Sequence, residues 1–98
     1  ANTGDITTRQ GIQYHFVRIE DVPAIFAELE SVGLTTSGAC GDITRNVTGC
    51  PLSGIDADEI IETEPFVEAI HQHFLNNKEF SNLPRKFKIT VTGCPLYC

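Results

Sequence analysis

Three stretches of the chain alternate apolar and polar residues with the period of a β-strand, in which successive side chains point to opposite faces. In the first of them, Ile12, Tyr14 and Phe16 alternate with Gln13 and His15, and aromatic and β-branched residues are enriched. The alternating stretches are residues 12–18, 42–48 and 85–93. We therefore predict three strands, each with one apolar face.

Two other stretches carry apolar residues at the spacing of an amphipathic helix. Residues 20–34 have Asp21 and Pro23 near their start and Gly33 where a C-terminal cap belongs. In residues 63–75, Thr63 stands at the expected N-cap position and Pro65 lies in the first turn. Both stretches are predicted to form helices of about three turns.

The order strand, helix, strand, helix, strand predicts an α+β sandwich in which a small sheet carries both helices on one face. The hexapeptide "VTGCPL" occurs twice, at residues 47–52 and 91–96, while the residues between the copies do not repeat. In both copies a β-branched strand ends at Gly-Cys-Pro, where proline stops the ladder of hydrogen bonds. The repeat is therefore interpreted as one local strand ending used twice.

Length and composition narrow the class of protein. Ninety-eight residues are enough for one domain with its own core, and 41% hydrophobic with 20% charged residues is a globular balance. No apolar run approaches the roughly 20 residues of a membrane span, and no secretory signal opens the chain, so we expect a cytoplasmic protein with no membrane partner. Because the first residue is Ala1 and the chain stops at Cys98, we expect a fragment of a longer protein.

A net charge of −6 excludes a nucleic-acid partner, since phosphate binding requires a surplus of cations on one face. Five of the seven cations nevertheless fall in three segments that are predicted as strands or strand edges. They are Arg9, Arg45, Arg85, Lys86 and Lys88. Together they suggest an anion-binding floor, with Lys86 and Lys88 on one side of their strand about 7 Å apart. The alternative is that they are three solvated strand faces.

The four cysteines leave several chemistries open. Disulfides are disfavoured without a secretory signal. Cys94 and Cys98 have a ligand-like spacing and are candidate metal ligands, whereas the spacing of Cys40 and Cys50 resembles no zinc finger or ribbon. An iron–sulfur site is chemically plausible with four thiolates. Free buried thiols are the alternative for Cys40 and Cys50.

Three ordered motifs, "TTRQGIQYHFV", "GACGDITRNVTGCPLSGID" and "NLPRKFKITVTGC", resemble the sirohaem-dependent nitrite and sulfite reductases over nearly the whole chain. The resemblance implies the amino-terminal half of such an enzyme. It assigns residues 1–82 to a ferredoxin-like half-domain and residues 83–98 to the truncated start of the sirohaem-binding catalytic domain. A fragment of this kind is expected to be inactive alone.

The resemblance also implies an activity, the six-electron reduction of nitrite to ammonia or of sulfite to sulfide, on a sirohaem coupled to a 4Fe-4S cluster. It places Arg9, Arg45, Lys86 and Lys88 in the catalytic site, and Arg9, Arg45 and Lys86 against the cofactor. The implied partners are the small anionic substrate and an electron donor such as ferredoxin or a reductase subunit. The cluster is expected mainly from the missing half, and none of the four cysteines is expected to be a ligand of it.

The wording "RNVTGCPLSGID" favours nitrite, while two lysines in "PRKFK" are more typical of the sulfite enzymes. Nitrite is the prediction and assimilatory sulfite reduction its alternative. Two alternatives of other classes remain. One is a non-catalytic metal-binding or electron-transfer module that uses the four cysteines, and the other is a plain structural ferredoxin-like domain.

Overall fold

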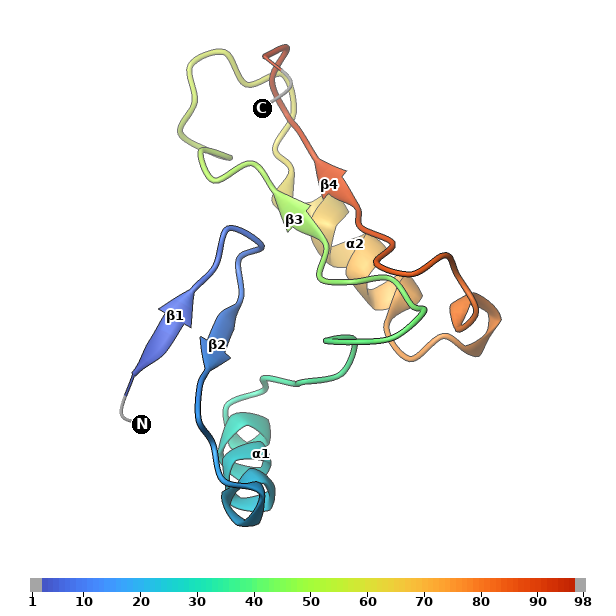
Figure 1. Cartoon of the computed structure of the whole chain (residues 1–98). Helices are drawn as coiled ribbons and strands as arrows, with labels where there is room; N and C mark the ends of the chain where they lie inside the picture. The colour runs from blue at the N-terminus through green and yellow to red at the C-terminus, as the bar shows by residue number, and fades with distance from the viewer. Residues whose placement is uncertain (1–2, 97–98) are drawn as a thin grey trace. The chain divides into compact units, whose positions relative to one another are not determined.

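The computed structural model describes residues 3–96 and divides the chain into two compact units, Ala1–Ser37 and Gly38–Cys98. Figure 1 shows the elements of both units. The first unit holds strands β1 and β2 and helix α1, and the second holds β3, α2 and β4.

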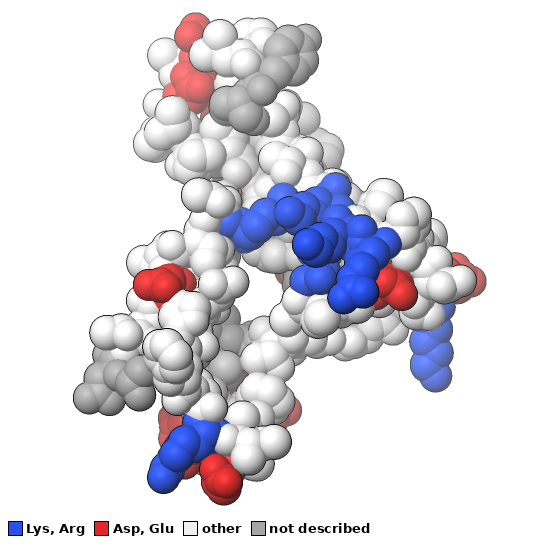
Figure 2. Space-filling model, in the orientation of Figure 1, with Lys and Arg blue, Asp and Glu red and all other residues white. Residues whose placement is uncertain are grey.

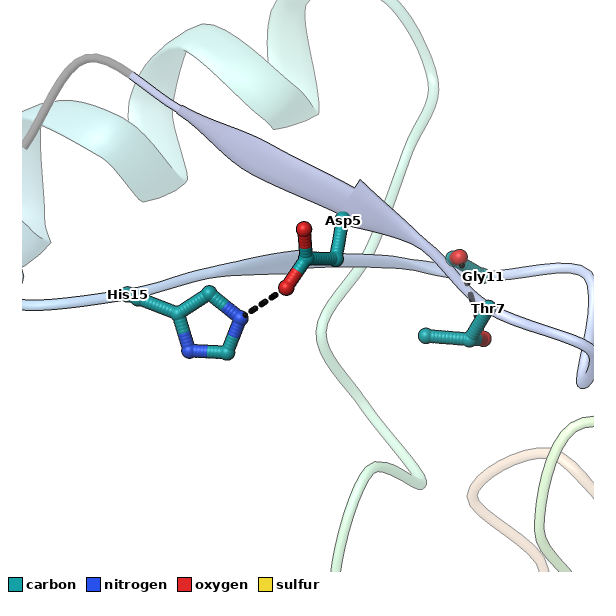
Figure 3. Close-up of polar contacts among 4 residues, drawn as sticks. All are labelled: Asp5, Thr7, Gly11 and His15. Atoms are coloured by element: carbon teal, nitrogen blue, oxygen red, sulfur yellow. Dashed lines mark hydrogen bonds and ion pairs between the residues drawn. The ribbon is translucent and has the colours of Figure 1, made fainter.

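The first unit begins with an antiparallel hairpin of β1 (Gly4–Ile6) and β2 (Ile12–Tyr14), in which Gly4 pairs with Tyr14 and Ile6 with Ile12. Thr7 closes the turn, because its backbone N–H and its hydroxyl both donate to the carbonyl of Gly11, at 2.9 and 3.1 Å (Figure 3). Asp5 and His15 meet on one face at 2.7 Å. The strand predicted over 12–18 is therefore real but shorter than expected.

The second part of this unit confirms the first predicted helix. A short 3₁₀ turn, η1 (Ile19–Asp21), leads into α1 (Val22–Ser31), and Pro23 occupies the first turn, where the missing N–H costs nothing. Asp21 stands at the N-cap position, but its carboxylate binds the guanidinium of Arg18 at 3.0 Å instead of capping the helix. Gly33 has a φ of +78°, the left-handed conformation that ends many helices.

In the second unit, β3 (Thr48–Gly49) and β4 (Thr90–Val91) form a parallel pair, and α2 (Glu64–Phe74) contacts both strands (Figure 1). The two strands predicted here were too long. Lys86 has a φ of +62°, and a backbone in that region cannot continue a β-ladder. Outside β3 and β4, isolated hydrogen bonds hold the segments 42–48 and 83–89 side by side.

The register of β3 and β4 accounts for the repeated hexapeptide. Thr48 pairs with Thr90 and Gly49 with Val91, so the two copies lie next to each other, displaced by two residues. That displacement keeps both glycines on one face. A Cβ on Gly49 would lie 3.0 Å from the hydroxyl oxygen of Thr63, and one on Gly93 would lie 2.9 Å from its methyl carbon. Both copies therefore need glycine, because Thr63 at the start of α2 packs closely against both strand ends.

Thr63 is 1% exposed, and its role differs from the predicted one. It occupies the N-cap position of α2, yet its side chain makes no capping hydrogen bond. Its backbone N–H donates to the hydroxyl of Ser53 at 2.8 Å, and its carbonyl accepts from Val67 at 3.0 Å. The side chain fills the space against the two glycines instead of capping the helix.

Ser53 is expected to matter for stability through this contact. Its hydroxyl accepts the Thr63 N–H and donates to the Glu59 carboxylate at 2.9 Å. Ser53→Ala leaves the N–H of a buried residue without its acceptor, so we expect a loss of about 1–3 kcal/mol in the free energy of unfolding. Ser81→Ala is the control, because the exposed Ser81 hydroxyl donates only to the Lys78 carbonyl. Denaturant midpoints of the full-length variants measure the difference, and equal losses at both positions would contradict the expectation.

The α+β class is confirmed, but its strands form two small sheets instead of one. Among the described residues α2 packs on β3 and β4 in the second unit, and α1 contacts η1 in the first unit. The contact division falls between residues 37 and 38. The domain boundary expected between residues 82 and 83 stays a prediction. Residues 83–91 stay with the second unit because they bond to residues 42–49.

Burial is concentrated around β3. Within residues 3–96 the buried hydrophobic side chains are Val47 and Cys94, while Ile6, Phe16 and Ile19 are each more than four-fifths exposed. The hydrophobic core of the described residues is therefore smaller than the length and composition of the chain led us to expect. None of the helices described for this chain is long and apolar enough to cross a bilayer.

Candidate functional site

Three of the predicted site residues come together in the second unit. The backbone N–H of Arg45 donates to the carbonyl of Phe87 at 2.9 Å, and Thr48 donates to Ile89 at 3.2 Å. The first bond places Arg45 beside the residue that separates Lys86 from Lys88. Segments that are more than 40 residues apart in the chain thus contribute one group of cations. Its members are Arg45, Lys86 and Lys88, which we call the cation cluster.

The cation cluster lies where anions can reach it. Lys86 and Lys88 are exposed and Arg45 is half-buried. Figure 2 shows Lys and Arg side chains gathered in one region over the segments next to β3 and β4, on a chain whose net charge is −6. The lysines do not alternate along a regular strand as predicted, because Arg85 and Lys86 form a turn and β4 begins only at Thr90. The three cations lie together because the segment around Phe87 is hydrogen-bonded to the segment around Arg45.

The guanidinium of Arg45 is held by a backbone carbonyl. Its Nη1 donates to the backbone carbonyl of Ala39. Its Nε is buried and has no hydrogen-bond acceptor among the described residues. The hydroxyl of the neighbouring Thr44 is also buried and also lacks a hydrogen-bond partner among these residues. A buried donor without a partner is costly, so this side of Arg45 is suited to an anionic oxygen supplied from outside these residues.

Arg9 lies in the other unit. It belongs to the turn between β1 and β2, not to a strand edge as predicted, and it is half-buried. The turn is closed by Thr7 and Gly11, and Gln10 adopts a φ of +56°. The hairpin therefore presents Arg9 at its tip. The catalytic and cofactor-binding role expected for Arg9 stays a prediction.

The cysteines differ in their solvent exposure. Cys40 is exposed, Cys50 is half-buried and Cys94 is buried, and all three are free thiols. Residues 3–96 contain no group of three or more His, Cys, Asp or Glu side chains placed to hold a metal ion. Cys98, the other predicted candidate ligand, lies outside the described residues.

Two features of the site escaped the sequence analysis. The Ala39 carbonyl that holds Arg45 is a backbone group, and any residue type can supply one. The left-handed backbone of Lys86 is rare for a residue with a long side chain. The glycines at positions 38 and 41 were a sequence signal for the Ala39 contact, since they permit an irregular turn around Ala39.

Family models match both parts of the chain. The nitrite/sulfite reductase ferredoxin-like half domain matches residues 1–32. The nitrite and sulphite reductase 4Fe-4S domain matches residues 40–98. The break between the two matches lies close to the division between the structural units.

Individual relatives agree with the family models. The chain is 47% identical over 94 residues to the assimilatory ferredoxin-dependent nitrite reductase of Haloferax mediterranei, covering 96% of this chain and 16% of that protein. It is 50% identical over 92 residues to a ferredoxin sulfite reductase of Mycolicibacterium paratuberculosis, covering 94% of this chain and 17% of that protein. The solved NirA protein of Mycobacterium tuberculosis superposes with a TM-score of 0.82 at 41% identity, over 92% of this chain and 16% of that structure. The chain therefore spans about a sixth of these proteins.

Proposed function

The chain belongs to the nitrite and sulphite reductase family, and from this premise we propose that it supplies anion-binding residues to the active site of an assimilatory nitrite reductase. The observation that carries the proposal is the hydrogen bond between Arg45 and Phe87, which brings Arg45 beside Lys86 and Lys88. A family whose substrates are small oxyanions needs such a group, and this acidic chain has few other cations from which to build it.

The cation cluster acts on the substrate by charge and by proton transfer. At an effective dielectric constant of about 20, each cation about 4 Å from an anionic oxygen contributes about 4 kcal/mol before desolvation. Arg45 offers a planar fork that remains charged at any working pH. The ammonium groups of Lys86 and Lys88 donate hydrogen bonds and can deliver protons to oxygen atoms that leave as water.

Sirohaem fits the cluster in chemical terms. The macrocycle carries several carboxylates, and the buried Nε of Arg45 lacks an acceptor among the described residues. Arg45 and Lys86 are the residues of this unit that we assign to its carboxylates, and Arg9 is assigned from the family resemblance. When bound, sirohaem supplies the redox-active iron, while the protein orients the substrate and balances its charge.

A 4Fe-4S cluster does not fit the described cysteines alone. Residues 3–96 bring no three potential ligands together, and Cys94 is buried while Cys40 is exposed. We therefore assign the cluster mainly to the rest of the full-length protein. Ferredoxin, named as the donor for the relatives, is the proposed electron donor. The cytoplasm is the proposed location.

Nitrite is the proposed substrate, and sulfite is the alternative because relatives of both kinds match equally well. The test is kcat/KM of the full-length protein with each anion and reduced ferredoxin, together with its sirohaem absorbance. We expect sirohaem absorbance and a preference for nitrite. A preference for sulfite would reverse the choice of substrate, and a protein that reduces neither anion would refute the proposed activity.

A further inference from the structure

The turn that precedes Arg45 has an unusual backbone. Gly38 and Gly41 have φ values of +82° and +98°, and they bracket Ala39 and Cys40. Space is not the reason for glycine here. A Cβ on Gly41 would meet no atom within 4 Å, and the nearest atom to one on Gly38 would be the Thr44 carbonyl oxygen at 3.7 Å. The turn therefore needs glycine for its left-handed backbone conformation alone.

The conformation of this turn determines where the Ala39 carbonyl points. That carbonyl accepts the hydrogen bond from Nη1 of Arg45. The carbonyl lies on a turn whose backbone enters through Gly38 and leaves through Gly41, so the left-handed conformation of the two glycines shapes the turn that carries it. The other end of Arg45 is held independently, because its backbone N–H is bonded to Phe87 at 2.9 Å. Arg45 is thus anchored both at its backbone and at its side-chain tip.

We propose that the turn 38–41 is a positioning element, which orients the guanidinium of Arg45 for the anion before the anion binds. The inference rests on the proposed function, since it assumes that Arg45 contacts an anion. A free arginine side chain samples many rotamers and loses that freedom on binding. An arginine that is already held in place avoids this loss at the time of binding and presents its fork in one direction. The turn itself need not touch substrate or cofactor.

The test substitutes the turn without removing any charge. Gly41→Ala forces a side chain into the left-handed region, whereas Gly41→Asn keeps a residue that tolerates it. We expect Gly41→Ala to lower kcat/KM of the full-length reductase for nitrite by about tenfold or more, and Gly41→Asn to restore most of the activity. A uniform loss in both variants would contradict the role of the left-handed backbone.

The chain offers matched controls at Gly33 and Gly54. Both have positive φ, at +78° and +84°, and a Cβ on either would meet nothing within 4 Å. Gly33→Ala and Gly54→Ala therefore impose similar backbone strain at positions outside the turn 38–41. We expect losses in melting temperature like that of Gly41→Ala, with kcat/KM within about twofold of the parent. Equal losses of kcat/KM in all three variants would overturn the inference.

A double-mutant cycle separates this inference from the proposed function. In an Arg45→Lys background the planar fork is gone, so adding Gly41→Ala is expected to have little further effect on kcat/KM. A full additional loss would show that the turn acts independently of Arg45, and the inference would fail while the proposed function stands. If Arg45→Lys alone leaves kcat/KM for both anions unchanged, the assignment of Arg45 in the proposed function fails, and the inference fails with it.

Discussion

Arg45→Gln in the full-length protein is expected to lower kcat/KM for nitrite by roughly 10- to 150-fold, the equivalent of one charge-assisted hydrogen bond of about 1.5–3 kcal/mol. The substitution removes the fork but keeps the backbone N–H that bonds to Phe87 at 2.9 Å. Arg45→Lys is also expected to be impaired, because a point charge cannot reproduce bidentate geometry. Steady-state kinetics, with sirohaem absorbance and melting temperature for each variant, provide the measurement.

A substitution of Lys86 tests the same cation cluster with the same measurements. Because its φ is +62°, Asn is the suitable neutral replacement, as it tolerates the left-handed region better than Ala. Lys86→Asn is expected to lower turnover to a similar extent with little change in melting temperature, since the side chain is exposed. Lys78→Ala is the control, being an exposed cation in η2 (Lys78–Phe80), outside the cluster. Losses at Arg45 and Lys86 no greater than at Lys78 would mean that the cluster is merely a solvated surface.

Gly93→Ala is expected to have the largest effect on stability, a loss of about 3 kcal/mol or more in the free energy of unfolding. A Cβ at this position would clash with the carbonyl oxygen of Ile61 and approach the Thr63 methyl carbon at 2.9 Å. The Ile61 carbonyl is backbone and cannot rotate away. Gly93 also accepts from the Ile60 N–H at 2.8 Å, so a displaced strand end would lose this bond as well.

Alanine substitutions at two other glycines show how much of the stability loss comes from close packing. Gly49→Ala is expected to cost less, because its Cβ would approach side-chain atoms of Thr63 and Val67 at 3.0 Å, and side chains can shift. Gly11→Ala is the control, since the nearest atom would be the Thr7 hydroxyl oxygen at an ordinary 3.8 Å. Urea midpoints of the full-length variants should therefore fall in the order Gly11, Gly49, Gly93, from least to most destabilised. A Gly93→Ala variant as stable as Gly11→Ala would disprove the close packing around Thr63.

The two predicted helices were confirmed because their evidence is local. In α2 the apolar residues recur at helical spacing, Pro65 lies in the first turn, and the bounds Glu64–Phe74 fall one residue inside the predicted range at each end. Hydrogen bonds within a helix join residues four apart, so a short window of sequence contains most of what the element requires. The same holds for Gly33 at the end of α1, where the expected left-handed cap is present.

The strands were predicted less well because a strand takes its partners from elsewhere in the chain. Alternation over 85–93 indicated one long strand, yet only Thr90–Val91 pair as a ladder, and Lys86 leaves the β region altogether. Whether a residue continues a ladder depends on the register of its partner, which the alternation itself does not contain. The two copies of the hexapeptide illustrate the point, since their shared need for glycine appears only once Thr63 is placed against both.

By itself the sequence determined the helices, the α+β class, the family and the residue types of the candidate site. The motifs around Arg45 and Lys86 are short and continuous in the chain, so their chemistry can be recognised from the sequence without the structure. Only the tertiary structure decided which cations meet, because the proximity of Arg45 to Lys86 and Lys88 depends on a hydrogen bond between segments 42 residues apart. It also decided how Arg45 is held, because the Ala39 carbonyl that accepts from its guanidinium is a backbone group that any residue type could supply.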